Sequence, residues 1–228
     1  INAVGILRQR IGETYDQVHH LAVSHLVNAC AEKGIRFLHV SALGLYNPTK
    51  SRFLSSKRLG EQAIQNSKAD WHICRASLVD GDGGYGAKWF RRVARWPIHF
   101  TPADAIAKLA PIHVKDLGEA IAKIALKAHT VKTTQERLYE LGGEHEMSVL
   151  EYLQTLKHGC GPLNAEAAKT KTMSMKVPAW MARLSSHLLD LLHLTPYSFG
   201  HYELLKFNNA PKTQQATLLL GRPCRGLG

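Results

Sequence analysis

The sequence lacks long apolar segments, which excludes one architecture at once. No run of 18 or more apolar residues occurs among the 228 residues, so no segment is predicted to cross a membrane as a helix. We expect no signal peptide in this sequence, which opens with Ile1-Asn2-Ala3-Val4-Gly5 instead of Met. Because this opening resembles the interior of a fold, we expect the chain to be part of a longer protein.

Metal-binding and disulfide patterns are also lacking. The 13 histidines are spread out, and the adjacent pair His19-His20 cannot place both rings on one helix face. The cysteines are scattered and form no C-x-x-C pair, which argues against a zinc site and a disulfide framework: Cys30, Cys74, Cys160 and Cys224. We therefore expect no bound metal. We expect reduced thiols and a protein of a cytoplasmic or matrix-like compartment, with a peripheral position at a membrane as an open option.

Acidic residues are scarce relative to basic ones. The chain has 18 Asp and Glu against 29 Lys and Arg, a net charge of +11. Such a charge suits nucleic acid, an anionic membrane surface, an acidic protein or a phosphate-rich cofactor. No nucleic-acid motif accompanies the charge, so no nucleic-acid partner is expected. We interpret the densest basic clusters as solvated surface: Arg91-Arg92-Arg95 and Lys169-Lys171-Lys176. For the first cluster, contact with a phosphate is the more specific alternative.

What is present is an alternation of helical and strand patterns. Apolar residues recur with a helical period over residues 15–33, and Gly34 suits the end of that helix. Residues 35–40 then read as a buried strand, 51–68 as a second helix and 71–78 as the next strand. This is the repeat of a doubly wound α/β fold.

Three side chains are predicted to share one cleft. Ser41 stands at the end of the first strand, and Phe53 and Lys57 are four residues apart on the following helix. Residues i and i+4 share a helix face, so both would point beyond the end of the strand. In open α/β sheets, ligands bind there.

These residues resemble the short-chain dehydrogenase/reductase superfamily. The family pattern is a Ser at a strand end, followed by Tyr-x-x-x-Lys on the next helix. More narrowly, the sequence is similar to the atypical, epimerase-like branch that includes the nucleotide-binding accessory subunit of respiratory complex I and its bacterial relatives. Ser41 and Lys57 match, but Phe53 takes the tyrosine position. Phenylalanine cannot exchange a proton, so this resemblance implies that the cofactor-holding half of the site is kept and the proton-transfer half is lost.

A second Tyr-x-x-x-Lys, from Tyr46 to Lys50, is interpreted as a decoy. Pro48 lies inside it and disfavours a helix.

The glycine run 81–86 spells G-x-G-x-x-G, yet no acidic ribose-binding residue follows at the spacing of a dinucleotide fingerprint, and Asp82 would repel a phosphate. We interpret that run as a flexible loop.

The resemblance implies further site residues. The family has a strand ending in Asn-x-x-Gly beside the cofactor, and a loop over the nicotinamide after an Arg-Pro-x-x-Val-x-Gly segment. Arg75, Val79 and Gly81 match the second pattern. We expect NADP or NAD to be the cofactor, and the predicted cofactor-binding residues are Asn2, Val4, Gly5, Ser41, Lys57, Ala76 and Ser77.

The expected fold is a partial, Rossmann-like parallel sheet with a mostly helical C-terminal region, lacking the first βαβ unit. Residues 1–160 would form the C-terminal part of an NAD(P)-binding domain, with substrate-lobe segments interleaved at about 80–110, and residues 161–228 a helical region. Asp116 is predicted to cap a helix, Ser148 and Glu151 to form a capping box, and helices to begin at Pro178 and Pro196.

We expect an NAD(P)-binding protein that is catalytically weak or silent, with a structural or redox-sensing role linked to a respiratory complex. One alternative is an active nucleoside-diphosphate-sugar epimerase, dehydratase or reductase. Another is a scaffold that binds a partner or an anionic membrane through its basic face and the amphipathic helix at 177–194. The substrate and the choice between NAD and NADP stay open.

Overall fold

The computed structural model describes residues 1–48, 50–126, 137–157, 173–192 and 199–227. Helices and strands alternate through the first half of the chain and helices predominate toward its end. In chain order the elements are the π-helical turn η1 (Gln17–Leu21), α1 (Ala22–Glu32), β1 (Phe37–Ala42), α2 (Arg52–Gln65), β2 (Trp71–Ala76), β3 (Val79–Asp80), α3 (Tyr85–Ala94), β4 (Ile98–Pro102), β5 (Ile112–His113), α4 (Val114–Ala125), β6 (Leu138–Leu141), α5 (Val149–Lys157), β7 (Met173–Val177), α6 (Ala179–Leu192), α7 (Phe199–Leu204) and α8 (Gln215–Leu220).

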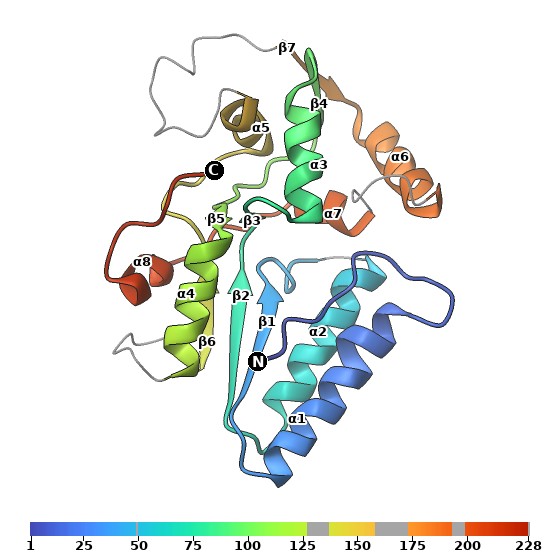
Figure 1. Ribbon diagram of the computed structural model, residues 1–228. Coiled ribbons are helices and arrows are strands. Elements are labelled where there is room, and N and C mark those ends of the chain that lie inside the picture. The colour runs from blue at the N-terminus through green and yellow to red at the C-terminus, as the bar shows by residue number, and fades with distance from the viewer. Residues whose placement is uncertain (49, 127–136, 158–172, 193–198, 228) are drawn as a thin grey trace.

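The main sheet is parallel, in the order β1-β2-β6 (Figure 1). The chain start continues it, because Asn2 forms a parallel bridge to His39, with its backbone bonded to Leu38 and Val40. Parallel strands need crossovers, which α2 supplies between β1 and β2. The predicted α/β fold with a partial parallel sheet is therefore confirmed.

Helices cover both faces of this sheet, so its strands are apolar on both sides. On one face, Val23 and Val27 of α1 and Ile64 of α2 pack on Phe37 and Ile73 of the strands. On the other, a larger cluster joins strand residues to α4 and α8: Leu38, Cys74, Ala76, Tyr139, Leu141, Leu117, Ala120, Ile124, Ala216 and Leu219. Alternate strand residues thus face opposite layers.

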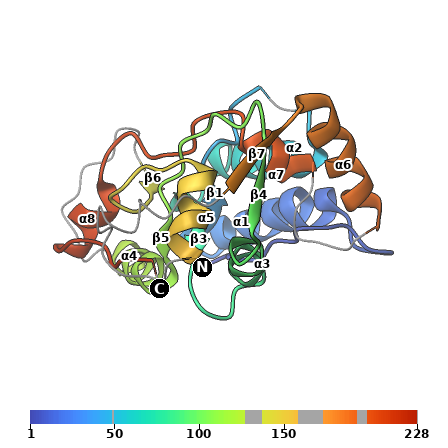
Figure 2. The ribbon, with the colours of Figure 1, turned by 90° about the horizontal axis from the view of Figure 1, so that it is seen from above.

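The remaining elements lie beyond the carboxyl ends of β1 and β2 (Figures 1 and 2). They comprise α3, α5, α6 and α7 and two small parallel pairs, β3 with β5 and β4 with β7. The strand β7 differs from the sequence interpretation, which gave that segment only a polar, basic texture. Its side chains are mostly exposed, so backbone pairing with β4 forms it rather than burial of an apolar face.

Helix ends match the prediction in two of three cases. Helix α6 follows Pro178, and Ser148 and Glu151 exchange hydrogen bonds as a capping box. The prediction for Asp116 was wrong: His113 is the N-cap of α4, and its ring accepts from the Lys115 amide. Asp116 instead lies buried in the first turn of α4. Its carboxylate oxygens accept hydrogen bonds from the guanidinium groups of Arg222 and Arg225 and from the Arg225 backbone amide.

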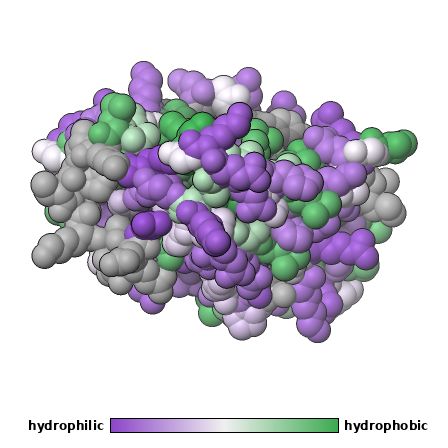
Figure 3. Space-filling view, turned by 90° about the horizontal axis from the view of Figure 1, so that it is seen from below, coloured by the Kyte–Doolittle hydropathy of each residue, from purple (hydrophilic) through white to green (hydrophobic). Residues whose placement is uncertain are grey.

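Three predictions lie outside the described residues: the basic positions Lys169 and Lys171, and the helix start at Pro196. In the described part of the chain, no helix is both long enough and apolar enough to cross a membrane. Figure 3 shows the face at the amino ends of the strands, where hydrophilic side chains surround small, separated hydrophobic groups.

Candidate functional site

The site lies where β1 ends and α2 begins. The backbone amides of Lys50 and Ser51, at the start of α2, donate to the carboxylate of Glu203 on α7, with N to O distances of 2.7–3.1 Å. An anion at a helix N-terminus satisfies amides that have no partner inside the helix. Glu203 thereby ties the C-terminal region to α2, a contact that the sequence analysis did not anticipate.

Phe53 lies in the first turn of α2 and is buried. Its ring packs edge-on against Tyr15 and His19 of the preceding helix and stacks on His201 of α7, with centroid distances of 5.5–5.6 Å. Aromatic packing of this kind stabilises a fold but supplies no proton. At the position where the resembled family has an acid, this chain therefore has a packing residue.

Lys57 lies one turn further along α2, as the i+4 spacing predicted. Its Nζ is 5.6 Å from the centroid of the Phe53 ring, and no residue in the described part of the chain hydrogen-bonds to it. Burial lowers the pKa of Lys57 below its ordinary value, and the Glu61 carboxylate partly opposes that shift. The amine is thus poised to bind a ligand oxygen.

Glu61 does not form the helix pair with Lys57 that its i+4 position suggested. It is fully buried and accepts a bidentate pair from Arg75 of β2, with nitrogen to oxygen distances of 2.6–3.1 Å. The Arg75 guanidinium also lies over the Tyr46 ring, 4.5 Å from its centroid. A buried carboxylate prefers the planar, two-pronged guanidinium, which leaves the lysine amine free.

Ser41, at the end of β1, has a buried hydroxyl that has no hydrogen-bond partner within the described residues. Such a group is costly unless a ligand or water satisfies it. Next to it, the chain start is shaped by Asn2, whose amide donates to His39 Nδ1 and whose carbonyl oxygen accepts from the Val4 amide. Val4 itself is exposed.

Gly5 forms a small recess beside the lysine. A Cβ there would lie 3.5 Å from Lys57 Nζ and 3.6 Å from His19 Nε2. The same His19 nitrogen accepts from the Ile6 amide, while its Nδ1 bonds to Ser56. The backbone at Gly5 therefore passes close to the amine, and its approach to a cofactor stays a prediction.

Two buried histidines stay neutral beside Lys57. Burial, helped by the Lys57 charge, lowers the pKa of His19 to about 3 and that of His39 to about 4. Neutral rings are consistent with the hydrogen bonds that each accepts, from the Ile6 amide and from the Asn2 side chain respectively. The site therefore concentrates its positive charge on the lysine. From the sequence, His19 is a candidate only for metal binding, and no local pattern marks it as a buried neutral ring beside Lys57.

The alternative Tyr46 and Lys50 pair is confirmed as a decoy. Tyr46 lies in a turn and Lys50 lies two residues before α2, so neither belongs to a helix. The glycine run is likewise no phosphate cradle at a first strand, because it leads from β3 into α3. Arg91, considered for phosphate contact, is already paired with the buried carboxylate of Asp80.

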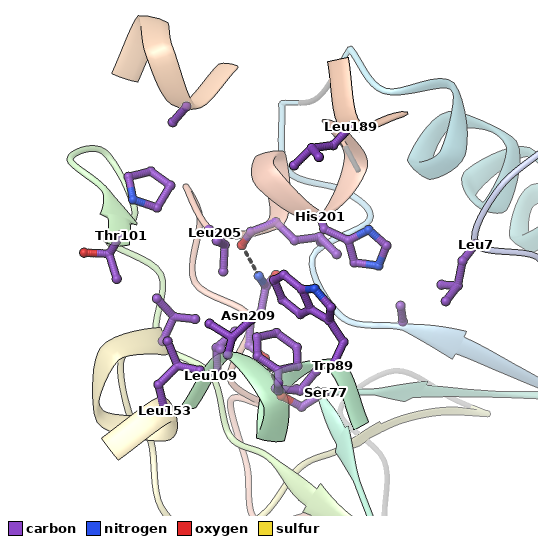
Figure 4. Close-up of a pocket in the computed structure, with 18 of the residues that line it drawn as sticks. Leu7, Ser77, Trp89, Thr101, Leu109, Leu153, Leu189, His201, Leu205 and Asn209 are labelled. Carbon is purple, nitrogen blue, oxygen red and sulfur yellow. Dashed lines mark hydrogen bonds between the residues drawn. The ribbon is translucent and has the colours of Figure 1, made fainter. Parts of the chain in front are cut away.

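A pocket of about 750 Å³ opens beside Phe53 and Lys57 (Figure 4). Ala76 and Ser77, predicted from the resemblance, line it, whereas Asn2, Val4, Gly5 and Ser41 are not among its described lining residues. The site thus has two adjoining parts. One is polar and surrounds Lys57 and the chain start, and the other is the pocket lined by residues of α3 and α7.

No family model matches the chain. It is 28% identical over 131 residues to a ceramide reductase of Caulobacter vibrioides, an alignment that covers 57% of this chain and 40% of that protein. It is 26% identical over 166 residues to the mitochondrial NADH dehydrogenase [ubiquinone] 1 alpha subcomplex subunit 9 of Dictyostelium discoideum, which covers 71% of this chain and 42% of that one. The aligned part thus spans about 40% of the length of these relatives.

Solved structures show the same fold. An NADPH-dependent quinone oxidoreductase from Escherichia coli, solved with NADPH, matches with a TM-score of 0.61 at 16% identity, covering 90% of this chain and 68% of that one. A UDP-glucuronic acid 4-epimerase from Bacillus cereus, solved with NAD, matches at 0.59 and 15%, covering 96% and 66%. The fold is that of Rossmann-like reductases and epimerases. The predicted resemblance to the branch that contains a complex I subunit is confirmed by the sequence relatives.

The buried histidines predict a loss of stability in mild acid. Their native pKa values of about 3 and 4 lie below the unfolded value near 6.5, so the unfolded state binds more protons between those limits. The free energy of unfolding should be at its full value above pH 6.5 and fall as pH decreases toward 4, by about 1.4 kcal/mol per pH unit for each histidine. Urea unfolding followed by tryptophan fluorescence measures this.

The His39→Gln variant should flatten that slope, because glutamine cannot take up the proton in the unfolded state. His25→Gln, at an exposed position of α1, is the matched control. An equal slope in the wild type and in His39→Gln would contradict the assignment of His39 as a buried neutral group.

Proposed function

We propose that this chain forms the nicotinamide-side and substrate-side part of an NAD(P)-binding protein related to the short-chain dehydrogenase/reductases. Two polar groups carry the proposal. The Ser41 hydroxyl is buried at the end of β1 without a hydrogen-bond partner among the described residues, and the Lys57 amine, 5.6 Å from the centroid of the Phe53 ring, likewise has none there. Solved proteins of the same fold bind NAD or NADPH according to their descriptions, which supports the same cofactor class here.

The residues present fit a dinucleotide. The Lys57 amine would donate to the ribose hydroxyls next to the nicotinamide, and the recess at Gly5 would let the backbone approach the same ring. When bound, the cofactor supplies a reversible hydride carrier. The residues that would hold it are those predicted from the resemblance: Asn2, Val4, Gly5, Ser41, Lys57, Ala76 and Ser77.

Phe53 makes the proposed protein catalytically weak or silent. A carbonyl can be reduced efficiently only if a group supplies a proton to its oxygen, and the ring of Phe53 has none to give. Lys57 has the geometry to bind and orient, and its lowered pKa still leaves it a donor that holds a ligand oxygen. A retained binding half with a lost proton-transfer half supports a structural or redox-sensing role.

The proposed protein partner is a respiratory complex. The support is similarity to proteins described as subunits of mitochondrial NADH dehydrogenase. Cys30, Cys74 and Cys224 are free thiols in the described part of the chain, which agrees with a reducing compartment such as the cytoplasm or the matrix. We further propose that residues near 80–110 act as interleaved substrate-lobe segments, since α3 and β4 both line the pocket.

A second role, docking on an anionic membrane, is favoured by the outer side of α6. Trp180, Met181, Leu184 and Leu188 form a stripe along this helix and are 45–68% exposed. Exposed Arg183 belongs to the same helix, and the chain carries a net charge of +11. A helix with this pattern lies in a bilayer interface, where apolar burial and attraction to anionic lipids act together.

Binding of the dinucleotide is tested by calorimetric titration of NADPH, then NADH, into the full-length protein. We expect saturable binding, and at least about a tenfold loss of affinity in Lys57→Met, since a charge-assisted hydrogen bond to the ribose is removed. The control Lys68→Met removes an exposed lysine just after α2. Equal affinities of the wild type and Lys57→Met would contradict the proposed role of the amine.

Catalytic silence is tested by turnover. We expect the wild type to reduce neither a quinone nor a nucleotide-linked keto-sugar with NADPH, because Phe53 provides no acid. Phe53→Tyr should retain nucleotide affinity and raise turnover, with the gain measured by the loss of NADPH absorbance. Robust turnover by the wild type would overturn the proposal and favour the alternative of an active epimerase, dehydratase or reductase.

Membrane docking is tested with vesicles of phosphatidylcholine, with and without phosphatidylglycerol. Binding should need the anionic lipid, weaken with salt and fall by at least about tenfold in Trp180→Gln/Leu184→Gln. Leu218→Gln, which alters an exposed leucine on the distant helix α8, is the control. No binding at low salt would remove this second role.

A further inference from the structure

The pocket next to Lys57 has walls from many parts of the chain. Residues of α2, α3, β4, α5, β7, α6 and α7 all line it, and it lies beyond the carboxyl ends of β1 and β2. Its volume of about 750 Å³ falls within the range of about 300–1,000 Å³ that is common for small-molecule sites. The size alone allows either a sugar nucleotide or a lipid, so the chemistry of the wall has to decide.

The wall is predominantly apolar. Aromatic rings come from α3 and β4, and aliphatic side chains from α5, β7, α6 and α7; the large apolar lining residues include Trp89, Phe90, Val93, Trp96, Phe100, Leu109, Val149, Leu153, Val177, Leu189, Leu204 and Leu205. Figure 4 shows Leu109 and Leu153 toward one end of the pocket, together with Thr101. A hydroxyl or phosphate placed against such side chains would lose water without gaining a partner.

Several polar side chains of the wall are already engaged with the protein. The Ser77 hydroxyl donates to the carbonyl of Asn209 and accepts from the Ala110 amide. The Asn209 side-chain amide donates to the carbonyl of Leu204, as the dashed line in Figure 4 marks. The Ser185 hydroxyl donates to the carbonyl of Ala182. The Ser77 and Ser185 hydroxyls therefore have no hydrogen left to donate to a sugar, whereas the buried side-chain oxygen of Asn209 has no partner among the described residues.

The charged and polar lining residues lie in more than one part of the pocket: Lys57 and His201 near Phe53, the exposed Arg92 on α3, and Thr101 on β4. Phe53 contacts both Lys57 and His201, so these two lining residues lie at the same end. In Figure 4, His201 and Leu7 lie opposite Thr101 and Leu153. Burial lowers the pKa of His201 to about 4, which keeps the ring neutral at physiological pH and leaves the cation of Lys57 to attract an oxygen.

We infer that the pocket binds a long-chain amphiphilic lipid, with alkyl or isoprenoid chains against the aromatic and aliphatic wall and an oxygen-bearing head at the Lys57 and His201 end. The inference deepens the proposed function, because the head would lie beside the place proposed for the nicotinamide. At the Phe53 end a head oxygen meets the Lys57 cation. The exposed Arg92 of α3 is a second cation among the described lining residues, so the orientation follows from the proposed place of the nicotinamide beside Lys57 and not from charge alone.

Helix α6 supplies independent support. Its inner side contributes Ala182, Ser185 and Leu189 to the pocket, while Trp180 and Leu184 are exposed on its outer side. One helix thus separates the apolar pocket from an apolar surface stripe. A lipid that enters from a bilayer would have to cross only this helix, whereas a sugar nucleotide gains nothing from such a boundary.

The test uses cis-parinaric acid, a polyene fatty acid whose fluorescence rises on entering an apolar site, with the full-length protein. We expect saturable binding, displacement by palmitoylethanolamide and no displacement by millimolar UDP-glucose. The variant Trp96→Gln/Phe100→Asn should weaken binding by at least about tenfold, because it removes two aromatic contacts. Both side chains line the pocket and are nearly half exposed, so we expect the fold to tolerate the two substitutions.

The control is Ile106→Asn, which alters an exposed apolar residue close to β4 that is not among the described lining residues. Unsaturable binding, or equal binding by the wild type and Trp96→Gln/Phe100→Asn, would overturn the inference, as would displacement by UDP-glucose alone. NADPH calorimetry on the same preparation separates the two proposals. Nucleotide binding without parinaric acid binding refutes the lipid site alone, and the reverse result refutes the dinucleotide site alone.

Discussion

The close approach of α2 to the π-helical turn η1 is the constraint on which the site depends. A Cβ at Gly60 would lie 2.0 Å from the carbonyl oxygen of His19, so only glycine permits this contact. The turn widens the helix at that point, and π-helical turns are frequent at functional sites. Because the two backbones touch, the His19 ring packs against Phe53 and bonds to Ser56 of the same helix α2. Lys57 then stands over the recess at Gly5.

Two buried carboxylates hold α2 against the rest of the molecule, and neither uses the lysine. Glu61 binds Arg75 of the sheet, and Glu203 of α7 binds the amides at the N-terminus of α2. Losing one member of such a pair leaves a buried charge without a partner, which is strongly destabilising. Because these carboxylates are paired with other groups, the Lys57 amine and the Ser41 hydroxyl are left available to a ligand. Lys57 lies between the polar recess at Gly5 and the apolar pocket.

Local patterns predicted the layers of this fold, and the i+4 spacing of Phe53 and Lys57 correctly placed both side chains at one pocket, although Ser41 is not among its described lining residues. Periodicity suffices there because burial on a helix face or within a strand repeats along the sequence. It fails where distant segments meet. Arg222 and Arg225 pair with the Asp116 carboxylate, and His113 is the N-cap of α4 instead. Glu61 pairs with Arg75 and not with Lys57. Strand β7 forms only by pairing with β4. His201 and Glu203 come to the site from a segment about 150 residues beyond Ser51 in the chain, and no short-range signal marks them.

The proposed dinucleotide site depends on Lys57, a half-buried amine that has no hydrogen-bond partner among the described residues. Heteronuclear NMR of the lysine side-chain methylene next to the amine measures this directly in the full-length protein, as a pH titration with and without NADPH. We expect Lys57 to titrate below its ordinary pKa of 10.5. We also expect the methylene resonance and the titration midpoint to change when NADPH is added. A Lys57 that titrates at 10.5 and does not respond to NADPH would contradict the account.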